Sequence, residues 1–162
     1  MGLDMYLSKR IYVGANYKHN EVTGTIDLKT GGGPIKINKD KVTYITEDAG
    51  YWRKANHIHK WFVDNVQEGE DDCREYYVPK EKLKELLETC ERVLKEAVLE
   101  KGQIHNGTSI SNGETTEHYE EGMVVKNPEI CEELLPTASG FFFGGTEYDQ
   151  YYLQDVESTI KI

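Results

Sequence analysis

The sequence predicts an α+β fold in which about four helices pack against a mainly antiparallel sheet. Three observations lead to this prediction. Apolar and polar side chains alternate at residues 3–13 and again at 42–46, which is typical of half-buried strands. Over residues 79–98, apolar side chains recur every three or four positions, which is typical of an amphipathic helix. Strand-like and helical segments then alternate in the second half of the chain.

The first part of the chain is expected to contain strands. Residues 3–13 form the first, and residues 22–37 alternate again on either side of a glycine-rich break, which indicates a hairpin with a flexible loop. The three glycines are not followed by the G-K-[ST] pattern of a phosphate-binding loop, so that function is rejected. Residues 42–46 are expected to form another strand.

A helix is expected to follow, because apolar side chains from residue 51 to residue 66 share one stripe at about 100° per residue. The stripe consists of Tyr51, Ala55, Ile58, Phe62 and Val66. Asp48 is the expected N-cap, and Gly69 is the expected stop signal.

Residues 73–78 are short, aromatic and β-prone, and they predict a strand. Pro79 then opens the clearest helix, which is expected to end at Gly102. Cys90 lies on the apolar stripe of this helix and is therefore expected to be a core residue.

Residues 103–122 are polar, and they contain two Asn-Gly pairs, Asn106-Gly107 and Asn112-Gly113. They predict either an exposed hairpin-like insertion or a mobile loop. The chain is expected to return as a strand at residues 123–125. Asn127 is then expected to cap a short helix that Pro128 opens and that runs through Leu135.

Residues 140–146 place three phenylalanines between glycines, which favours a central strand covered on both faces. Thr146 and Asp149 resemble the start of a capped last helix. One face of that helix would carry Tyr148, Tyr152, Val156 and Ile160.

Composition limits the functions open to the chain. Its 162 residues are expected to form one domain, 1–162, with the polar segment at 103–122. The net charge of −10 argues against general nucleic-acid binding, which depends on cations. Cys73, Cys90 and Cys131 are widely spaced without a C-x-x-C pair, so neither a disulfide framework nor a metal site is indicated, and no cofactor is expected. The absence of a leader and of a long apolar segment predicts a cytoplasmic protein without a membrane partner.

Residues 51–62 form the most informative stretch, because they contain both tryptophans of the chain together with three cations. On a helix, Trp52, His59 and Val63 would border the apolar stripe and Asn56 would lie just beyond it. Arg53 and Lys60 would follow on the adjoining polar face. Such an edge could line a pocket for a planar, anionic ligand. The alternative is a core tryptophan beside a solvated basic face. The full set of candidate ligand-binding residues is Trp52, Arg53, Asn56, His59, Lys60, Arg74, Gly145, Thr146 and Tyr148.

Gly145 and Thr146 belong to this set because the expected strand, Gly-Gly turn and helix start would expose backbone N–H groups at a positive helix end. Glu147 and Asp149 already supply negative charge there, which weakens the anion-binding interpretation. For an enzyme, His59 would be the general base, oriented by Asp72 or Asp149. No spacing of nucleophile, base and acid supports catalysis, so binding without turnover is favoured.

Four stretches carry a resemblance: residues 1–7, 51–62, 71–78 and 134–149. Together they resemble a group of small, functionally uncharacterised proteins found in bacteriophages and their bacterial hosts. The resemblance covers most of the chain except residues 103–122, and it implies a viral context without implying an activity or a catalytic residue. By analogy, many small phage proteins act against host defence.

The sequence therefore predicts a phage-type protein that binds a nucleotide-like small molecule and sequesters a host immune signal. In this hypothesis Trp52 stacks on a base while Arg53 and Lys60 meet phosphate. One alternative is a phosphodiesterase or another hydrolase acting on such a nucleotide. The other is an acidic protein that inhibits a host defence protein by binding it. A homodimer in the host cytoplasm is the expected form.

Overall fold

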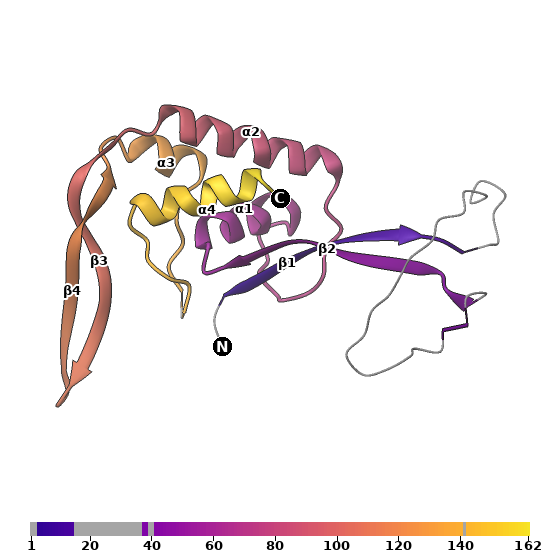
Figure 1. Cartoon of the computed structure of the whole chain (residues 1–162), viewed down its shortest axis with the longest axis horizontal. Helices are drawn as coiled ribbons and strands as arrows, with labels where there is room; N and C mark the ends of the chain where they lie inside the picture. The colour runs from indigo at the N-terminus through magenta and orange to yellow at the C-terminus, as the bar shows by residue number, and fades with distance from the viewer. Residues whose placement is uncertain (1–2, 15–36, 39–40, 141) are drawn as a thin grey trace. The chain divides into compact units, whose positions relative to one another are not determined.

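The computed structural model describes residues 3–14, 37–38, 41–140 and 142–162. These residues contain four α-helices and two antiparallel two-stranded sheets (Figure 1), which confirms the α+β prediction. The strands divide between two sheets, β1 with β2 and β3 with β4. The chain splits into two compact units, Tyr6–Tyr51 on the one hand and Met1–Met5 with Trp52–Ile162 on the other. We call the latter the helical unit.

The Tyr6–Tyr51 unit is built on the paired strands β1 (Asp4–Tyr12) and β2 (Tyr44–Arg53), whose ends continue into the helical unit. The strand predicted at residues 3–13 is thus confirmed. Cross-strand pairs of aromatic rings join the two strands, with centroids 5.1 Å apart both for Tyr6 with Tyr51 and for Tyr12 with Tyr44. Nearly all of the hairpin predicted at residues 22–37 lies outside the described residues.

β2 is longer than its expected counterpart at residues 42–46, and this shifts the start of the helix. Residues 51–53 belong to the strand, and Asp48 lies inside it, so Asp48 is not an N-cap. Lys54 has φ 60°, and the chain turns there before α1 (Asn56–Val66) begins. The predicted stop is confirmed, because Gly69 has φ 84° and its N–H donates to the Val63 carbonyl at 2.9 Å.

Residues 73–78 are not a strand, contrary to the prediction; they run irregularly, and Cys73 has φ 60°. Pro79 precedes α2 (Lys80–Glu96), whose buried side chains include Cys90, as expected. The helix ends well before Gly102. Asn127 explains this end, because its side chain accepts a hydrogen bond from the Val98 N–H at 2.8 Å and donates one to the Glu96 carbonyl at 2.9 Å.

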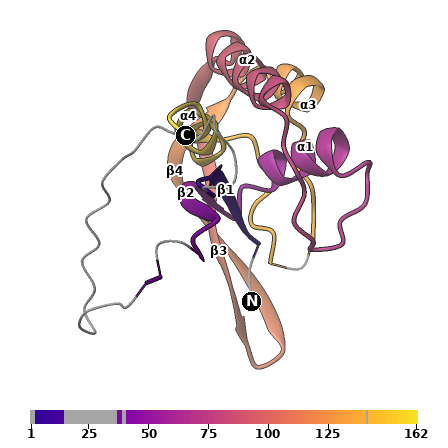
Figure 2. The ribbon, with the colours of Figure 1, turned by 90° about the vertical axis from the view of Figure 1, so that its right-hand side faces the viewer.

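Strands β3 (Leu99–Ser111) and β4 (Glu114–Val125) form a long hairpin. Of the two interpretations of residues 103–122, the structure therefore shows the hairpin. Asn112 and Gly113, with φ 53° and 84°, are the two residues of its tip, where a type I′ turn needs positive φ at both positions. The other Asn-Gly pair lies at a break in the register between His105 and Thr108, where β3 bulges. In both views the hairpin extends away from the helices (Figures 1 and 2).

Helix α2 packs against α1, α3 (Glu129–Leu134) and α4 (Gln150–Ile160), and α4 also contacts β4. Asn127 does not cap α3, which follows Pro128 without a side-chain cap. The core of the helical unit lies among these elements. Its buried apolar side chains are Trp52, Ala55, Ile58, Trp61, Phe62, Leu86, Cys90, Val93, Ile104, Val125, Cys131, Leu135, Tyr152 and Val156.

The described residues between 140 and 146 do not form the predicted central strand. Phe142 has φ 66° and is 54% exposed, whereas a covered strand would bury it. The last helix begins later than expected, since Asp149 and not Thr146 is the N-cap of α4. Within the described ranges, every helix is too short or too polar to span a bilayer.

Candidate functional site

Trp52 is a core residue and cannot stack on a ligand. Only 5% of its surface is exposed, its indole N–H donates to the Thr159 hydroxyl at 2.9 Å, and its ring meets the Phe62 ring edge-on at 5.6 Å. The neighbouring Arg53 is exposed on the last residue of β2. The predicted cavity shared by an indole and a guanidinium is therefore wrong, and the core alternative holds for Trp52. The cause is the strand geometry, which points successive side chains to opposite faces.

Asn56 is fully buried at the first position of α1, and its side-chain amide is occupied by backbone. It donates to the carbonyls of Phe143 and Gly145, at 3.3 and 2.7 Å, and accepts from the Ala138 N–H at 3.0 Å. Three partners use the hydrogen-bonding capacity that a ligand would need. Asn56 thus ties Ala138, Phe143 and Gly145 to the start of α1.

His59 and Lys60 follow on the same helix but do not converge. His59 is 7% exposed, with its Nε2 3.5 Å from an Asp71 carboxylate oxygen and its ring edge-on to Phe143 at 5.4 Å. Lys60 pairs with Asp64 one turn along, at 2.7 Å. The predicted orienting acids for His59 are both wrong, because Asp71 takes that position. No adjacent hydroxyl or thiol nucleophile accompanies this pair among the interactions of the described residues.

Arg74 is engaged within its own segment. Its guanidinium pairs with Asp72, its backbone N–H donates to the same carboxylate at 3.1 Å, and the Tyr76 hydroxyl also donates to Asp72 at 2.9 Å. The Arg74 hydrogen bonds hold the pKa of Asp72 below its usual value. This arrangement is a local turn on an exposed segment. The Arg74 guanidinium and the Asp72 carboxylate neutralise each other there, so neither charge is directed at a ligand.

The expected anion site at the last helix is occupied by the chain itself. The Asp149 carboxylate accepts from the N–H groups of Tyr151 and Tyr152, at 2.8 and 3.1 Å, which are the groups an anion would bind. Gly145 and Thr146 precede the helix and are held elsewhere: Asn56 binds the Gly145 carbonyl, and Thr137 donates to the Thr146 carbonyl at 3.0 Å.

Tyr148 also serves the packing of this segment. Its hydroxyl accepts from the Thr137 N–H at 3.3 Å, and its ring meets Tyr152 at 5.0 Å. Of the predicted site residues, the structure thus brings together Asn56 and Gly145 by a direct hydrogen bond. Thr146 and Tyr148 share one partner, Thr137, whereas Trp52, Lys60 and Arg74 each bind a different residue.

His57 is a buried titratable group that the sequence did not single out. It is 3% exposed, its ring lies 4.3 Å from the Tyr152 ring, and its Nε2 has no hydrogen-bond partner among the residues that the structure describes. Burial lowers its pKa from 6.5 to about 3, so the imidazole is neutral in the folded protein. Its ring contact is with the core residue Tyr152, and the sequence pattern contains no signal that separates it from His59.

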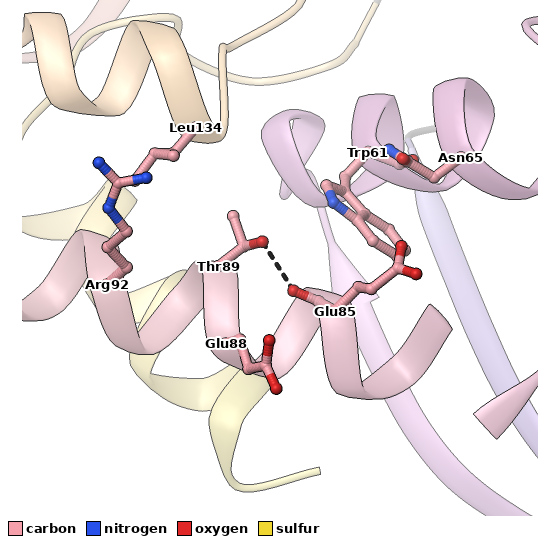
Figure 3. A pocket seen from close by; sticks show the side chains of 7 residues that line it. All are labelled: Trp61, Asn65, Glu85, Glu88, Thr89, Arg92 and Leu134. Atoms are coloured by element: carbon pink, nitrogen blue, oxygen red, sulfur yellow. Dashed lines mark hydrogen bonds between the residues drawn. The ribbon is translucent and has the colours of Figure 1, made fainter. Parts of the chain in front are cut away.

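A shallow hollow of about 380 Å³ lies where α1, α2 and α3 meet (Figure 3). Trp61 and Leu134 form its apolar part, and the remaining residues of its lining are Asn65, Glu85, Glu88, Thr89 and Arg92. The Thr89 hydroxyl donates to the Glu85 carbonyl at 2.7 Å, and Arg92 is paired with Glu96 at 2.8 Å. With its cation already paired and two glutamates at its rim, the hollow does not favour a phosphate group.

The described residues hold no cluster of three or more His, Cys, Asp or Glu side chains that could bind a metal ion. Comparison of the chain with protein-family models, with characterised proteins and with solved structures gave no match. The feature that stands out on the surface of the chain is the β3–β4 hairpin.

Proposed function

We propose that this chain is a protein-binding module that engages a basic surface of a partner protein through the β3–β4 hairpin. The main support for this proposal is the negative charge of the hairpin. Residues 99–125 contain five glutamates, Glu100, Glu114, Glu117, Glu120 and Glu121, against a single lysine, Lys101. All but Glu120 of these glutamates are exposed, and the hairpin extends away from the helices (Figures 1 and 2).

A projecting acidic ribbon suits electrostatic recognition. Charge of one sign accelerates encounter with a surface of opposite sign and disfavours partners of like sign. The ribbon also presents exposed apolar side chains near its acids, with Ile110 76% and Tyr119 57% exposed. Tyrosine is enriched at interfaces because it combines a large apolar ring with a hydroxyl.

The phage-like resemblance gives this proposal a biological setting. In a phage protein, the partner would be a host factor with a basic surface, and inhibition of that factor, including a defence protein, would be the consequence of binding. This is the alternative that the geometry supports best. The nucleotide hypothesis is less well supported, because Trp52, Asn56 and Arg74 are occupied by contacts within the chain. The hydrolase hypothesis is also less well supported, because no nucleophile accompanies His59 among the described interactions.

A capture experiment with charge-matched variants tests the proposal. The immobilised protein is incubated with host lysate, and the bound proteins are identified by mass spectrometry. The test variant replaces Glu114, Glu117, Glu120 and Glu121 by glutamine, which removes the charge and keeps the side-chain length and one acceptor oxygen. The control variant makes the same change in four exposed helical glutamates, Glu81, Glu91, Glu132 and Glu133.

We expect a basic protein to be captured by the wild type and by the control variant, and to be lost with the hairpin variant. Raising the ionic strength from about 0.1 M to about 1 M shortens the Debye length from about 10 Å to about 3 Å and should release the partner. Equal capture by both variants, or a partner that resists salt, would contradict the proposal. Circular dichroism of each variant checks that the fold is intact.

A further inference from the structure

The outer edge of β4 is already used by the chain near the base of the hairpin. The Val125 N–H donates to the Tyr148 carbonyl at 2.9 Å, and the Met123 N–H donates to the Gln150 side chain at 3.0 Å. Val124 forms an antiparallel bridge with Asp149. A short extended segment thus lies beside β4, on the side opposite β3, and pairs with it as a third strand would.

The alternation of an antiparallel ladder shows which residues continue this edge. Successive residues of a strand direct their backbone groups alternately to one neighbour and to the other. Since Val125 and Met123 face outward, Glu121, Tyr119 and Glu117 face outward as well. They lie opposite Gln103, His105 and Thr108 in the register. The bulge inserts its extra residue in β3, so the alternation of β4 is not interrupted.

The outward backbone groups of these three residues have no backbone partner among the described residues outside the hairpin. They form an exposed edge of the kind that accepts an added strand. A two-stranded ribbon is marginally stable in water unless a third strand or a helix supports it. Helix α4 still reaches β4 at Glu120, whose carboxylate accepts from the Tyr151 hydroxyl at 3.4 Å. From Tyr119 to the tip, β4 makes no hydrogen bond to described residues outside the hairpin.

Charge decides what can occupy this edge. β4 carries Glu114, Glu117, Glu120 and Glu121 and no lysine or arginine. Cross-strand pairs of opposite charge stabilise a ladder, whereas like charges placed opposite each other destabilise it. A second copy of this hairpin would oppose glutamate to glutamate. A segment with lysine or arginine side chains would instead form favourable pairs along both faces.

We propose that the edge of β4 from residue 115 to residue 121 binds an extended, lysine- or arginine-bearing segment of the partner protein as an added strand. This inference rests on the proposed function, which supplies the basic partner protein, and it adds how that partner is recognised. Backbone hydrogen bonds hold the segment in register, and the glutamates select its side chains. The added strand would lie on the same side of β4 as Tyr148 and Asp149.

Amide hydrogen exchange measured by NMR tests this mode directly. The probe is a synthetic peptide of alternating lysine and threonine, added to the full chain. We expect the outward amides of Glu121, Tyr119 and Glu117 to exchange at least about tenfold more slowly at saturating peptide, because they become hydrogen-bonded. The inward amides of Glu120 and His118, which already face β3, should not change.

A proline variant supplies a second test. Proline is tolerated on an edge strand where the N–H faces outward, so Tyr119→Pro should remove one outward donor and keep the hairpin's own ladder. Tyr119→Thr is the matched control, since it removes the same ring and keeps the N–H. We expect the proline variant to bind the peptide at least about tenfold more weakly than the threonine variant, from the lost hydrogen bond and the blocked edge.

The outcomes separate this inference from the proposed function. Peptide binding without slower exchange at the outward amides, or equal affinities of the two variants, would overturn strand addition and leave charge-based binding intact. Absence of peptide binding would also overturn strand addition, while the capture experiment judges the proposed function independently. An alternating protection pattern together with the proline effect supports it.

Discussion

His57 shows how a single side chain can couple the fold to pH. Its ring is buried beside Tyr152, and no described residue forms a hydrogen bond with its Nε2. The pKa of His57 falls from 6.5 in a model peptide to about 3 in the folded protein, because burial disfavours the charged imidazolium. In the unfolded chain the same side chain is solvated, so it takes up a proton with its ordinary pKa of 6.5.

We expect acid to weaken the fold through this residue. Between pH 6.5 and about 3, the unfolded state binds a proton at His57 that the folded state does not bind, so the free energy of unfolding falls as the pH drops through this window. Each tenfold difference in proton affinity is worth about 1.4 kcal/mol, so the loss amounts to several kcal/mol. Urea unfolding of the wild type and His57→Phe across the window measures it.

Asp155 must be considered in the same experiment because it acts in the opposite direction. Burial and the nearby Asp149 raise the pKa of Asp155 from 3.8 to about 6, so its protonation favours the folded state as the pH falls. The wild-type profile is the sum of such effects, and the difference between wild type and variant isolates His57. Exposed His118→Gln is the control. Equal acid sensitivity of the wild type and His57→Phe would contradict the assignment.

At the scale of elements, the sequence predicted the long, strongly periodic segments well and the junctions badly. The helix after Pro79 begins where predicted, although it ends at Glu96 and not at Gly102, and the first strand is where its pattern placed it. The stripe from Tyr51 to Val66 mixed two elements, since its first residues extend β2 and only the later ones belong to α1. A few apolar residues at a junction fit either period, and the turn at Lys54 carries no glycine or proline signal.

This junction also explains why the candidate site was misplaced. The proposed pocket depended on Trp52 and His59 sharing one helix, which the turn at Lys54 prevents. The partners that hold Asn56 and Trp52 lie at Gly145 and Thr159, more than eighty residues away. Such long-range contacts override local patterns and have no counterpart in a single sequence.

Two glycines face each other across the β3–β4 hairpin, and their missing side chains make room for apolar neighbours. Gly102 and Gly122 are partners in the register. A Cβ added at Gly122 would lie 2.6 Å from the Ile104 Cδ1, and one added at Gly102 would lie 2.7 Å from a methyl group of Val124. Ile104 is only 2% exposed, so this part of the hairpin belongs to the core.

We therefore expect Gly122→Ala to destabilise the protein by about 1–3 kcal/mol, the usual cost of overfilling a packed core. Chemical denaturation of Gly122→Ala, Ile104→Val and the double variant measures the coupling between the two positions. Because Ile104→Val removes the Cδ1 atom, the alanine should cost less in the valine background. Strictly additive effects would show that the added methyl group does not press on Ile104.

At the scale of the whole molecule, the β3–β4 hairpin divides along its length into a buried base and an exposed outer part. Its base, with Ile104 and Val125 buried, is part of the core of the helical unit and is bridged to residues 148–150. The residues nearer the tip, from 105 to 119, are exposed or half-exposed. Their hydrogen bonds run largely within the hairpin, as between Ser109 and His118 or between Tyr119 and Glu117.

Shortening the hairpin should therefore remove binding while leaving the fold intact. Ile104 and Glu120 are register partners, as are Ser111 and Glu114, which flank the present turn. In both pairs the backbone groups face the partner strand of the hairpin. Replacing residues 105–119 by Asn-Gly reproduces that two-residue connection. We expect the melting temperature, followed by circular dichroism, to change by no more than a few degrees, since a 1 kcal/mol change shifts it by only about 2–4 °C in a chain of this size. The same variant should fail to capture the basic partner. Loss of cooperative unfolding would mean that the outer hairpin stabilises the helical unit, and retained capture would place the binding surface elsewhere on the chain.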